Sequence, residues 1–235
     1  MSKAISIIFT VILAVALPMT IVLTSVQLVA FNEDFFMEEF EKYDRMEATG
    51  MDKDQLSKIA RAFIDYLSLK KDELNMQVVV NGRQRLLFND KELMHMDDVR
   101  NLFKGGFALR LWSVILSAIS ITVIGLWGHR KGIDGIARAL AWASGVPLVL
   151  GAVIAMLLAT DFDRWFIYFH LTFFNNDLWQ LDPSTDMLIN IFNEGFFADA
   201  AFRILLYAAI TMAVILAVSM AWIVYRNKKA PKSQR

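Results

Sequence analysis

The stretch AISIIFTVILAVALPMTIVLTSVQLV, residues Ala4–Val29, contains no charged side chain. A helix of this length exceeds the roughly 30 Å hydrocarbon core of a bilayer. The run is also longer than the roughly 7–15 apolar residues typical of a signal-peptide core, and no small-residue cleavage motif closes it. We therefore expect a retained membrane helix, in which Pro18 is tolerated as a kink.

Three further apolar runs are long enough to cross a membrane: Phe107–Trp127, Ile136–Ala159 and Arg203–Tyr225. The chain is 56% hydrophobic, and its mean hydropathy is +0.43. These values are too apolar for an ordinary soluble domain. The sequence therefore predicts an all-α integral membrane protein with four transmembrane helices.

The charges are divided between the segments that join these runs. Nine bases and one acid, Asp134, belong to the terminal pieces and the 127–138 connection; the bases are Lys3, Arg130, Lys131, Arg138, Arg226, Lys228, Lys229, Lys232 and Arg235. The other 23 of the 24 acids lie in Ala30–Gly106 and Thr160–Asp199. Because basic loops stay in the cytoplasm, we expect both termini to be cytoplasmic and the two acidic segments to be extracytoplasmic.

The expected organisation follows from these runs and charges. It comprises transmembrane helix 1 (1–29), an extracytoplasmic segment (30–106), helix 2 (107–127), a cytoplasmic loop (128–135), helix 3 (136–159), an aromatic extracytoplasmic or re-entrant segment (160–199), helix 4 (200–225) and a basic cytoplasmic tail (226–235).

The first outer segment has the pattern of a small α+β unit. Apolar periodicity predicts helices over Glu33–Ala48 and Asp52–Leu69. The turn pair Asn81-Gly82, with Val78–Val80 as one arm and Arg85–Phe88 as the other, predicts a hairpin over Gln77–Phe88. A short helix is expected over Lys91–Phe103, with Asp90 or Asn89 as N-cap and Gly105-Gly106 as its end.

The second outer segment is too aromatic for a simple loop, so we expect it to lie in the membrane interface or to fold back into the helices. Asn176 and Asp177 are embedded among aromatic residues that include Tyr168 and Trp179. Polar groups in such a setting are costly unless they have a role. Asp182 is expected to cap a short helix, Pro183–Phe192.

His95 and His170 lie in the two outer segments, and His129 is expected on the opposite side. Histidine changes charge near neutral pH, so two histidines on one side suggest proton transfer. Asp98 follows His95 by three residues, on one helix face, where it could orient the imidazole and favour His95 as the base. The sequence leaves open which histidine is base and which is acid.

Arg110 and Arg203 are expected at the outer ends of helices 2 and 4, where they snorkel to the interface or hold a lipid phosphate or polar ester. Tyr168, Asn176, Asp177 and Trp179 are further candidates for contact with a substrate.

Three classes of function remain open from the residues alone. One is metal-free acid–base catalysis by the two histidines. The second is a metal-dependent membrane hydrolase whose ligands are the two histidines and an Asp, although no His-Glu-x-x-His motif occurs. The third is a membrane sensor or assembly factor without catalysis. The absence of cysteine excludes a thiolate nucleophile and disulfides, and no Gly-x-Ser-x-Gly, P-loop or Rossmann motif is present.

The four apolar runs, HMDDV at His95–Val99 and FHLTFFNNDLWQLDPSTDMLINIFNEGFF at Phe169–Phe197 together resemble the lipoprotein intramolecular transacylases. This is a family of bacterial integral membrane proteins first catalogued as a domain of unknown function. The resemblance covers essentially the whole chain and is most specific over Phe169–Phe197. Asn193 departs from the family pattern, where proline is expected, and this bears on loop shape rather than on chemistry.

The resemblance implies a membrane acyltransferase. Such an enzyme moves the sn-2 acyl chain of a diacylglyceryl-cysteine lipoprotein to the cysteine α-amine and leaves a lyso-form lipoprotein. The family's two functional histidines match His95 and His170. The implied partners are diacylglyceryl-modified lipoproteins and membrane lipid, with no nucleic acid, cofactor or metal. The implied location is the bacterial cytoplasmic membrane, with the active site on the outer face.

Overall fold

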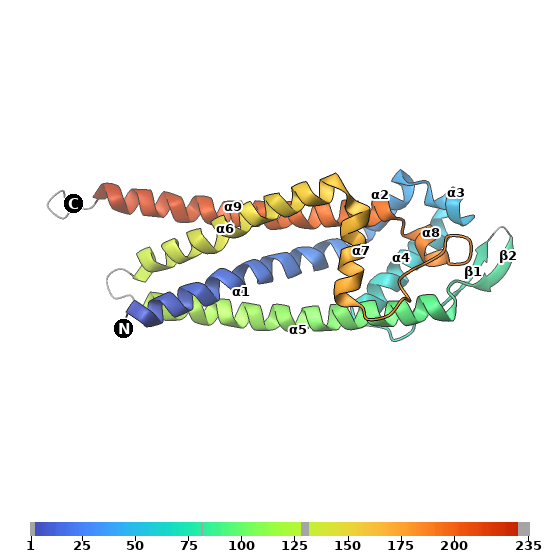
Figure 1. Cartoon of the computed structure of the whole chain (residues 1–235), viewed down its shortest axis with the longest axis horizontal. Helices are drawn as coiled ribbons and strands as arrows, with labels where there is room; N and C mark the ends of the chain where they lie inside the picture. Colours follow the sequence, from blue (N-terminus) through green and yellow to red (C-terminus); the bar gives the residue numbers. More distant parts are fainter. Residues whose placement is uncertain (1–2, 81, 128–131, 230–235) are drawn as a thin grey trace. The chain divides into compact units, whose positions relative to one another are not determined.

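The computed structural model describes residues 3–80, 82–127 and 132–229. Within them the chain is mainly helical and carries a two-stranded sheet (Figure 1). It divides into two compact units. The apolar unit comprises Met1–Val26, Phe107–Met156 and Ile204–Arg235, and the polar unit comprises Gln27–Gly106 and Leu157–Arg203. His129 lies outside the described residues.

Four helices among the described residues are long and apolar enough to cross a membrane. They are α1 (Lys3–Ala30), α5 (Asp90–Trp127), α6 (Gly132–Thr160) and α9 (Glu194–Lys229). The predicted number of membrane helices is therefore confirmed by length and composition. Pro18 and Pro147 both lie inside their helices, α1 and α6, as expected for membrane segments.

Small side chains let the helices of the apolar unit approach one another. Leu13 of α1 and Ile124 of α5 are buried with Ala139 and Ala143 of α6. Many large apolar side chains of the same helices point outward; Trp142, for example, is 67% exposed. An apolar surface of this kind is unfavourable in water and suited to lipid.

The predicted end of a helix at Gly105-Gly106 is wrong, because α5 continues through both glycines to Trp127. Neither glycine has the positive φ that would end a helix, and each has open space where a Cβ would stand. A glycine inside a helix costs about 1 kcal/mol relative to alanine, and the long apolar run that follows outweighs this cost. His95 therefore lies on the same continuous helix as a membrane-crossing segment.

Two helices of the polar unit match the predicted pattern with one interruption. The predicted helix Glu33–Ala48 is broken at Asp44, whose φ is 54°, into α2 (Glu33–Lys42) and α3 (Arg45–Thr49). The second predicted helix is confirmed as α4 (Lys53–Leu67), which starts at a capping box.

The predicted hairpin is present as β1 (Gln77–Val80) and β2 (Arg83–Leu86), paired antiparallel with Val80 opposite Arg83. Gly82 has a φ of 78°, a conformation that glycine adopts without strain in a tight hairpin turn.

The aromatic segment contains a helix that the sequence did not predict, α7 (Phe162–Phe173). Asp161 accepts a hydrogen bond from the Arg164 backbone N–H at 3.2 Å and so caps its N-terminus. The helix predicted over Pro183–Phe192 is shorter, as α8 (Met187–Ile191), and its N-cap is Asp186 rather than Asp182. Asp182 instead accepts from the backbone N–H and hydroxyl of Ser184, which closes the preceding turn.

Phenylalanine side chains form the core of the polar unit. Phe36 and Phe40 of α2 lie 5.2–6.1 Å, centroid to centroid, from Phe192 and Phe196, and Phe63 of α4 lies 4.5 Å from Phe192. Edge-to-face and tilted aromatic pairs add to the burial of apolar area. The cluster therefore fixes α2 and α4 against the turn that joins α8 to α9.

Gly195, near the start of α9, sets the packing of α2 at this junction. A Cβ at this position would overlap the ring of Tyr43, whose hydroxyl donates to Asp199 at 2.6 Å. We expect Gly195→Ala to lower the free energy of unfolding by about 1–3 kcal/mol, as overpacking does elsewhere. Reversible unfolding in mixed detergent micelles measures the change.

Gly106→Ala is the matched control, because nothing lies within 4 Å of the place on α5 where its methyl group would stand. A helical glycine replaced by alanine in open space should leave stability unchanged or raise it by up to about 1 kcal/mol. Equal stability of the two variants would contradict the assigned contact between Gly195 and Tyr43.

Candidate active site

His95 lies in the second turn of α5, and its side chain is turned inward. The residue is 6% exposed. Its Nδ1 atom is buried and has no hydrogen-bond partner among the described residues. Because buried polar atoms almost always have a partner, this ring nitrogen is available to bond a polar group that enters the site.

His170 lies in the last turn of α7 and is also 6% exposed. Its Nδ1 is 2.7 Å from the backbone carbonyl oxygen of Phe166, one helical turn earlier. A carbonyl oxygen only accepts hydrogen bonds, so Nδ1 carries the proton and donates it. In the neutral ring, Nε2 then has the free lone pair. Burial lowers the pKa of His170 below its ordinary value, and this favours the neutral ring.

The two imidazoles are neighbours. Their ring centroids are 5.9 Å apart, and the ring planes are inclined by 35°. Phe174 contacts both rings, at 5.3 Å from His95 and 5.5 Å from His170. The residues that the sequence placed in two separate segments therefore meet within the polar unit, in surroundings that exclude water.

Aromatic side chains enclose His170 on several sides. The ring of Trp179 stacks on the imidazole with a centroid distance of 4.8 Å and an interplanar angle of 28°. Phe166 packs edge-on at 4.3 Å and Phe169 at 5.4 Å. Such a shell holds the imidazole in one orientation and lowers the local dielectric, which strengthens hydrogen bonds made inside it.

Asp98 does not have the predicted contact with His95. Its Oδ2 accepts a hydrogen bond from Asn176 Nδ2 at 2.9 Å, whereas Nδ1 of His95 has no partner among the described residues. Asn176 Oδ1 in turn accepts from the backbone N–H of Leu178 at 3.1 Å. Asp98 and Asn176 therefore tie the loop after α7 to α5. Burial lowers the pKa of His95 to about 4 and outweighs the nearby charge of Asp98, so the predicted role of His95 as the more basic histidine is not supported.

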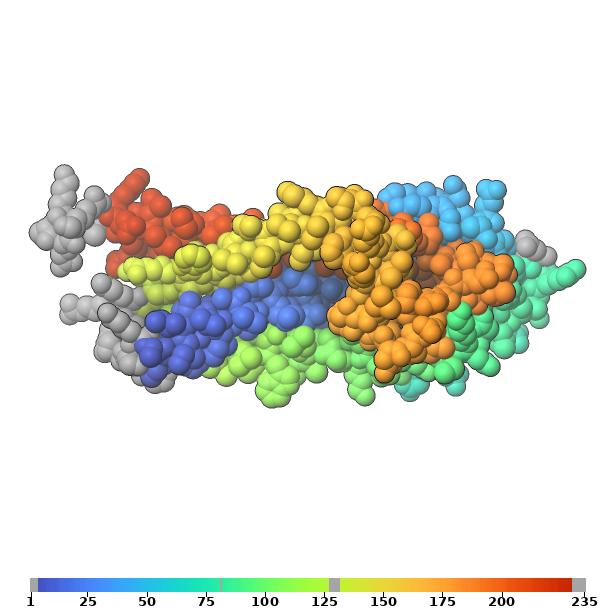
Figure 2. Space-filling view, viewed as in Figure 1, coloured from blue at the N-terminus to red at the C-terminus, as the bar shows by residue number. Residues whose placement is uncertain are grey.

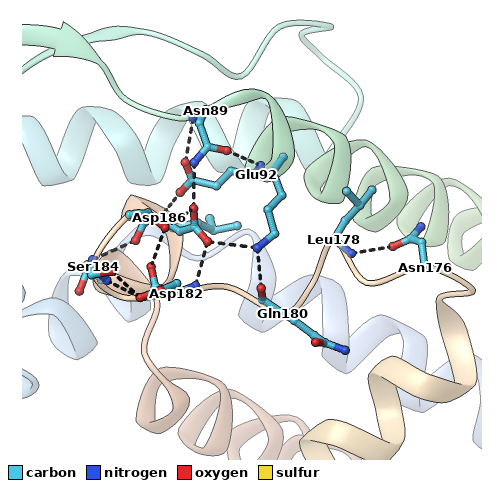
Figure 3. A network of polar contacts seen from close by, with 12 residues as sticks. Asn89, Glu92, Asn176, Leu178, Gln180, Asp182, Ser184 and Asp186 are labelled. Atoms are coloured by element: carbon cyan, nitrogen blue, oxygen red, sulfur yellow. Dashed lines mark hydrogen bonds and ion pairs between the residues drawn. The ribbon is translucent and has the colours of Figure 1, made fainter.

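A second polar network fixes the same loop at the N-terminus of α5 (Figure 3). Lys91 donates to the carbonyl of Gln180 at 2.6 Å and to Asp186 at 3.4 Å. Asn89 Nδ2 donates to Asp186 at 2.9 Å. Asp186 is 3% exposed and also accepts from the backbone N–H of Asp182. These bonds and the Asn176 contact hold both ends of the stretch that carries Trp179.

Glu92 links α8 to the same network. It is fully buried, and its two oxygens accept from the backbone N–H groups of Asn89 at 2.8 Å and Leu188 at 2.6 Å. Asn89 Oδ1 accepts from the Glu92 N–H at 3.0 Å, so the pair also forms a reciprocal N-cap of α5. Asn89 is thus the N-cap among the two residues that the sequence suggested.

The sequence reasoning missed Glu92 and Asp186. An Asn-x-x-Glu pattern at residues 89–92 signals a capping box and could have drawn attention to Glu92. Its second bond, to α8, joins residues 96 positions apart, and no local pattern predicts it.

The remaining predicted site residues lie apart from the imidazole pair. Tyr168 is exposed, and its ring contacts Trp165 at 5.6 Å. Asp177 is exposed and accepts from the side chain of Gln180. Arg203 pairs with Glu38 at 3.0 Å and lies over the ring of Phe35, so it has a structural partner within the polar unit. Arg110 belongs to the apolar unit.

In the described part of the chain, no group of three or more His, Asp or Glu side chains is arranged to hold a metal ion. The site as built offers two imidazoles, one indole N–H and a wall of aromatic rings. Figure 2 shows that α7 and the loop that follows it, in yellow and orange, form part of the molecular surface on the visible face.

Comparison with known proteins adds a family and a fold. The sequence profile of the family described as lipoprotein intramolecular transacylase Lit matches residues 11–197. No curated protein sequence matches the chain significantly.

Among solved structures, the chain is similar to the membrane-integral lipoprotein intramolecular transacylase Lit from Bacillus cereus, solved in meso. The identity is 18% and the TM-score 0.79, over 97% of this chain and 100% of that one. Two variants of that protein, with a histidine changed to arginine or to alanine, also match. Their identity is 18% each, and their TM-scores are 0.75 (95% of this chain, 93% of that one) and 0.72 (96% of each). At this identity the structures show a shared fold.

Proposed function

Because this chain belongs to the lipoprotein intramolecular transacylase family, we propose that it moves the sn-2 acyl chain of a diacylglyceryl-cysteine lipoprotein to the α-amine of that cysteine. The family profile covers residues 11–197 and so includes every residue of the imidazole pair and its aromatic enclosure. The observation that carries the proposal is the pair itself, two buried imidazoles with centroids 5.9 Å apart. Buried histidines that lie side by side are suited to moving protons.

The bond changes need only one molecule of substrate. The amine nitrogen attacks the ester carbonyl carbon, the C–N bond forms, and the C–O bond to the glyceryl oxygen breaks. The amine loses a proton, and the glyceryl oxygen gains one. Because donor and acceptor are on one molecule, an enclosure that bends the substrate brings them to a high effective molarity. No acyl-enzyme is required, which suits a chain without cysteine.

His170 is the better base of the two histidines. Its Nδ1–H is held by the Phe166 carbonyl, so the lone pair of Nε2 is the one available to the amine. The proton passes from the amine to Nε2 of His170. His170 then gives up a proton to His95, and His95 protonates the departing glyceryl oxygen. The pair is then unchanged at the end of the reaction, as a catalyst must be.

The charge distribution supports a site on the outer face of the bacterial cytoplasmic membrane. The segments that bear the histidines hold 23 of the 24 acids, and basic segments are retained in the cytoplasm. Lipoproteins expose their modified N-terminus on the outer face, and their acyl chains can reach such a site laterally through the outer leaflet. The chain has no native cysteine, so single introduced cysteines near positions 95 and 170 report the topology by labelling. Labelling from opposite faces would overturn the proposal.

The decisive experiment uses the purified full chain in lipid with a diacylated lipopeptide. Transfer within one molecule leaves the mass unchanged, so tandem mass spectrometry must locate the acyl group on the N-terminal amine. We expect an N-acyl, monoacylglyceryl product and no free fatty acid. Released fatty acid that disappears after chelation would identify a metal-dependent hydrolase, and an unaltered peptide would leave only a non-catalytic role.

The pH dependence of the rate should show two separate ionisations. The α-amine has a pKa of about 8, so the rate should fall about tenfold per pH unit below that value. Burial keeps the pKa of His170 below its ordinary value of about 6.5, so His170 becomes protonated only at lower pH. Below that pKa the rate should fall by a further factor of about ten per pH unit. Initial rates of the wild-type protein between about pH 5 and 9 test this expectation. A second ionisation at or above about 6.5 would contradict the assignment of His170 as the base.

A further inference from the structure

The indole N–H of Trp179 is buried and has no acceptor among the described residues. An indole nitrogen can only donate a hydrogen bond, so its partner must be an acceptor, which neither an aromatic ring edge nor another donor provides. A buried donor without a partner costs about 1–3 kcal/mol, and native structures contain few of them. The Trp179 N–H is therefore available to donate to a group that enters the enclosure.

The orphaned N–H belongs to the same enclosure as the imidazole pair. The Trp179 ring stacks on His170 with a centroid distance of 4.8 Å. The ring of His95 lies 5.9 Å from His170, and its Nδ1 is the other buried polar atom here without a partner among the described residues. Two buried polar atoms without a partner therefore belong to the two rings that flank His170, and both can bond polar atoms of a ligand that enters the enclosure.

The protein holds the indole in place before any ligand arrives. The Trp179 carbonyl accepts from the Leu181 N–H at 3.0 Å, and the preceding turn is closed by Asn176. Lys91 and Asp98 of α5 bond Gln180 and Asn176, which lie on either side of Trp179 in the sequence. A donor that is fixed in advance stabilises a developing negative charge without the cost of reorganising at that moment.

On the proposed function, the substrate brings one suitable acceptor, the carbonyl oxygen of the acyl ester. This oxygen becomes negatively charged when the amine adds to the carbonyl carbon. We propose that Trp179 is a catalytic residue whose Nε1–H donates a hydrogen bond to this oxygen in the tetrahedral intermediate. His170 then accepts the amine proton, while Trp179 stabilises the negative charge that forms on the former carbonyl oxygen.

The test must separate the N–H from the ring. Placing 3-benzothienylalanine at position 179 by amber suppression keeps the size and stacking surface of the indole but replaces N–H with sulfur. Trp179→Phe removes the donor with a smaller ring, and Trp165→Phe is the matched control, because Trp165 contacts Tyr168 rather than either histidine. The substrate is the diacylated lipopeptide, and kcat and KM are measured separately.

Loss of one oxyanion donor lowers kcat by about 100- to 1,000-fold in other acyl-transfer enzymes. We expect the benzothienylalanine and phenylalanine variants to lose kcat in this range while KM changes less than about threefold, with the Trp165 variant unaffected. A benzothienylalanine variant that keeps kcat within about threefold of wild type would overturn the proposal and leave stacking as the role of Trp179. A wild-type protein that forms no N-acyl product would instead overturn the proposed function, and this inference with it.

Discussion

Replacing His170 with alanine should abolish formation of the N-acyl product. General acid–base catalysis contributes about 100- to 10,000-fold, and the loss should lie at the upper end because the enclosure excludes water that could substitute as the base. His170→Gln should fail as well, since an amide has no basic nitrogen. Tandem mass spectrometry of the lipopeptide product measures the effect.

His95→Ala should be as severe as His170→Ala. If the glyceryl oxygen receives its proton through His95, removing the ring leaves an alkoxide without a donor in a water-poor site. The two losses should not add in the double variant, because residues that act as one unit are strongly non-additive. His129→Ala is the matched control, since it removes the third histidine of the sequence.

Both histidine variants should remain folded in the membrane, with a lowered unfolding midpoint because alanine leaves a cavity where a buried ring was packed. Retained product formation in either single variant would remove the two-histidine mechanism. A variant that is inactive but also unfolded would be replaced by the asparagine substitution, which is closer in size and can still fill the buried space.

The sequence was sufficient for the features that depend on composition and period. Four long apolar runs predict four membrane-crossing helices whatever their neighbours are, and Asn-Gly between two short arms predicts a hairpin. The candidate pair, His95 and His170, came from the division of charge and from the family resemblance. Their contact could not be predicted, because it depends on how two segments 75 residues apart fold together.

Expectations failed where tertiary contacts decide the outcome. Gly105-Gly106 has the composition of a helix end, yet the helix continues because an apolar run follows. Asp98 has the helical spacing to reach His95, yet it bonds Asn176, which a distant loop brings within 2.9 Å. Asp182 precedes proline and has the pattern of an N-cap, whereas Asp186 takes that place while it bonds Asn89 beside α5. In each case a neighbour outside the local pattern overrides the local preference.

Glu92→Ala should be the most destabilising substitution in the polar unit. Glu92 is fully buried, and its two oxygens satisfy two backbone N–H groups, those of Asn89 and Leu188. Each hydrogen bond to a charged group is worth about 1.5–3 kcal/mol, and alanine leaves both donors buried without a partner. We therefore expect the free energy of unfolding to fall by about 3–6 kcal/mol, measured by reversible unfolding in mixed detergent micelles.

Glu92→Gln keeps the size of the side chain but leaves one acceptor oxygen where the carboxylate has two. An amide has one acceptor oxygen, so either Asn89 or Leu188 would face an NH2 group instead of an oxygen. This variant should therefore lose about half as much stability as Glu92→Ala. Glu41→Ala is the matched control, because Glu41 and its partner Lys53 are both more than half exposed. Exposed ion pairs contribute about 0–1 kcal/mol.

The region that loses protection in Glu92→Ala shows why the variant is less stable. If Glu92 holds α8 against α5, hydrogen exchange at Met187–Ile191 should speed up in Glu92→Ala more than exchange in the hairpin does. Uniform acceleration throughout the polar unit would indicate a general loss of packing instead. The loop that carries Trp179 lies between α7 and α8, so selective loosening of α8 in Glu92→Ala should also lower kcat. This loss of kcat should persist at a temperature low enough to keep the variant folded. Stability and catalysis are then joined through one buried carboxylate that contacts neither imidazole.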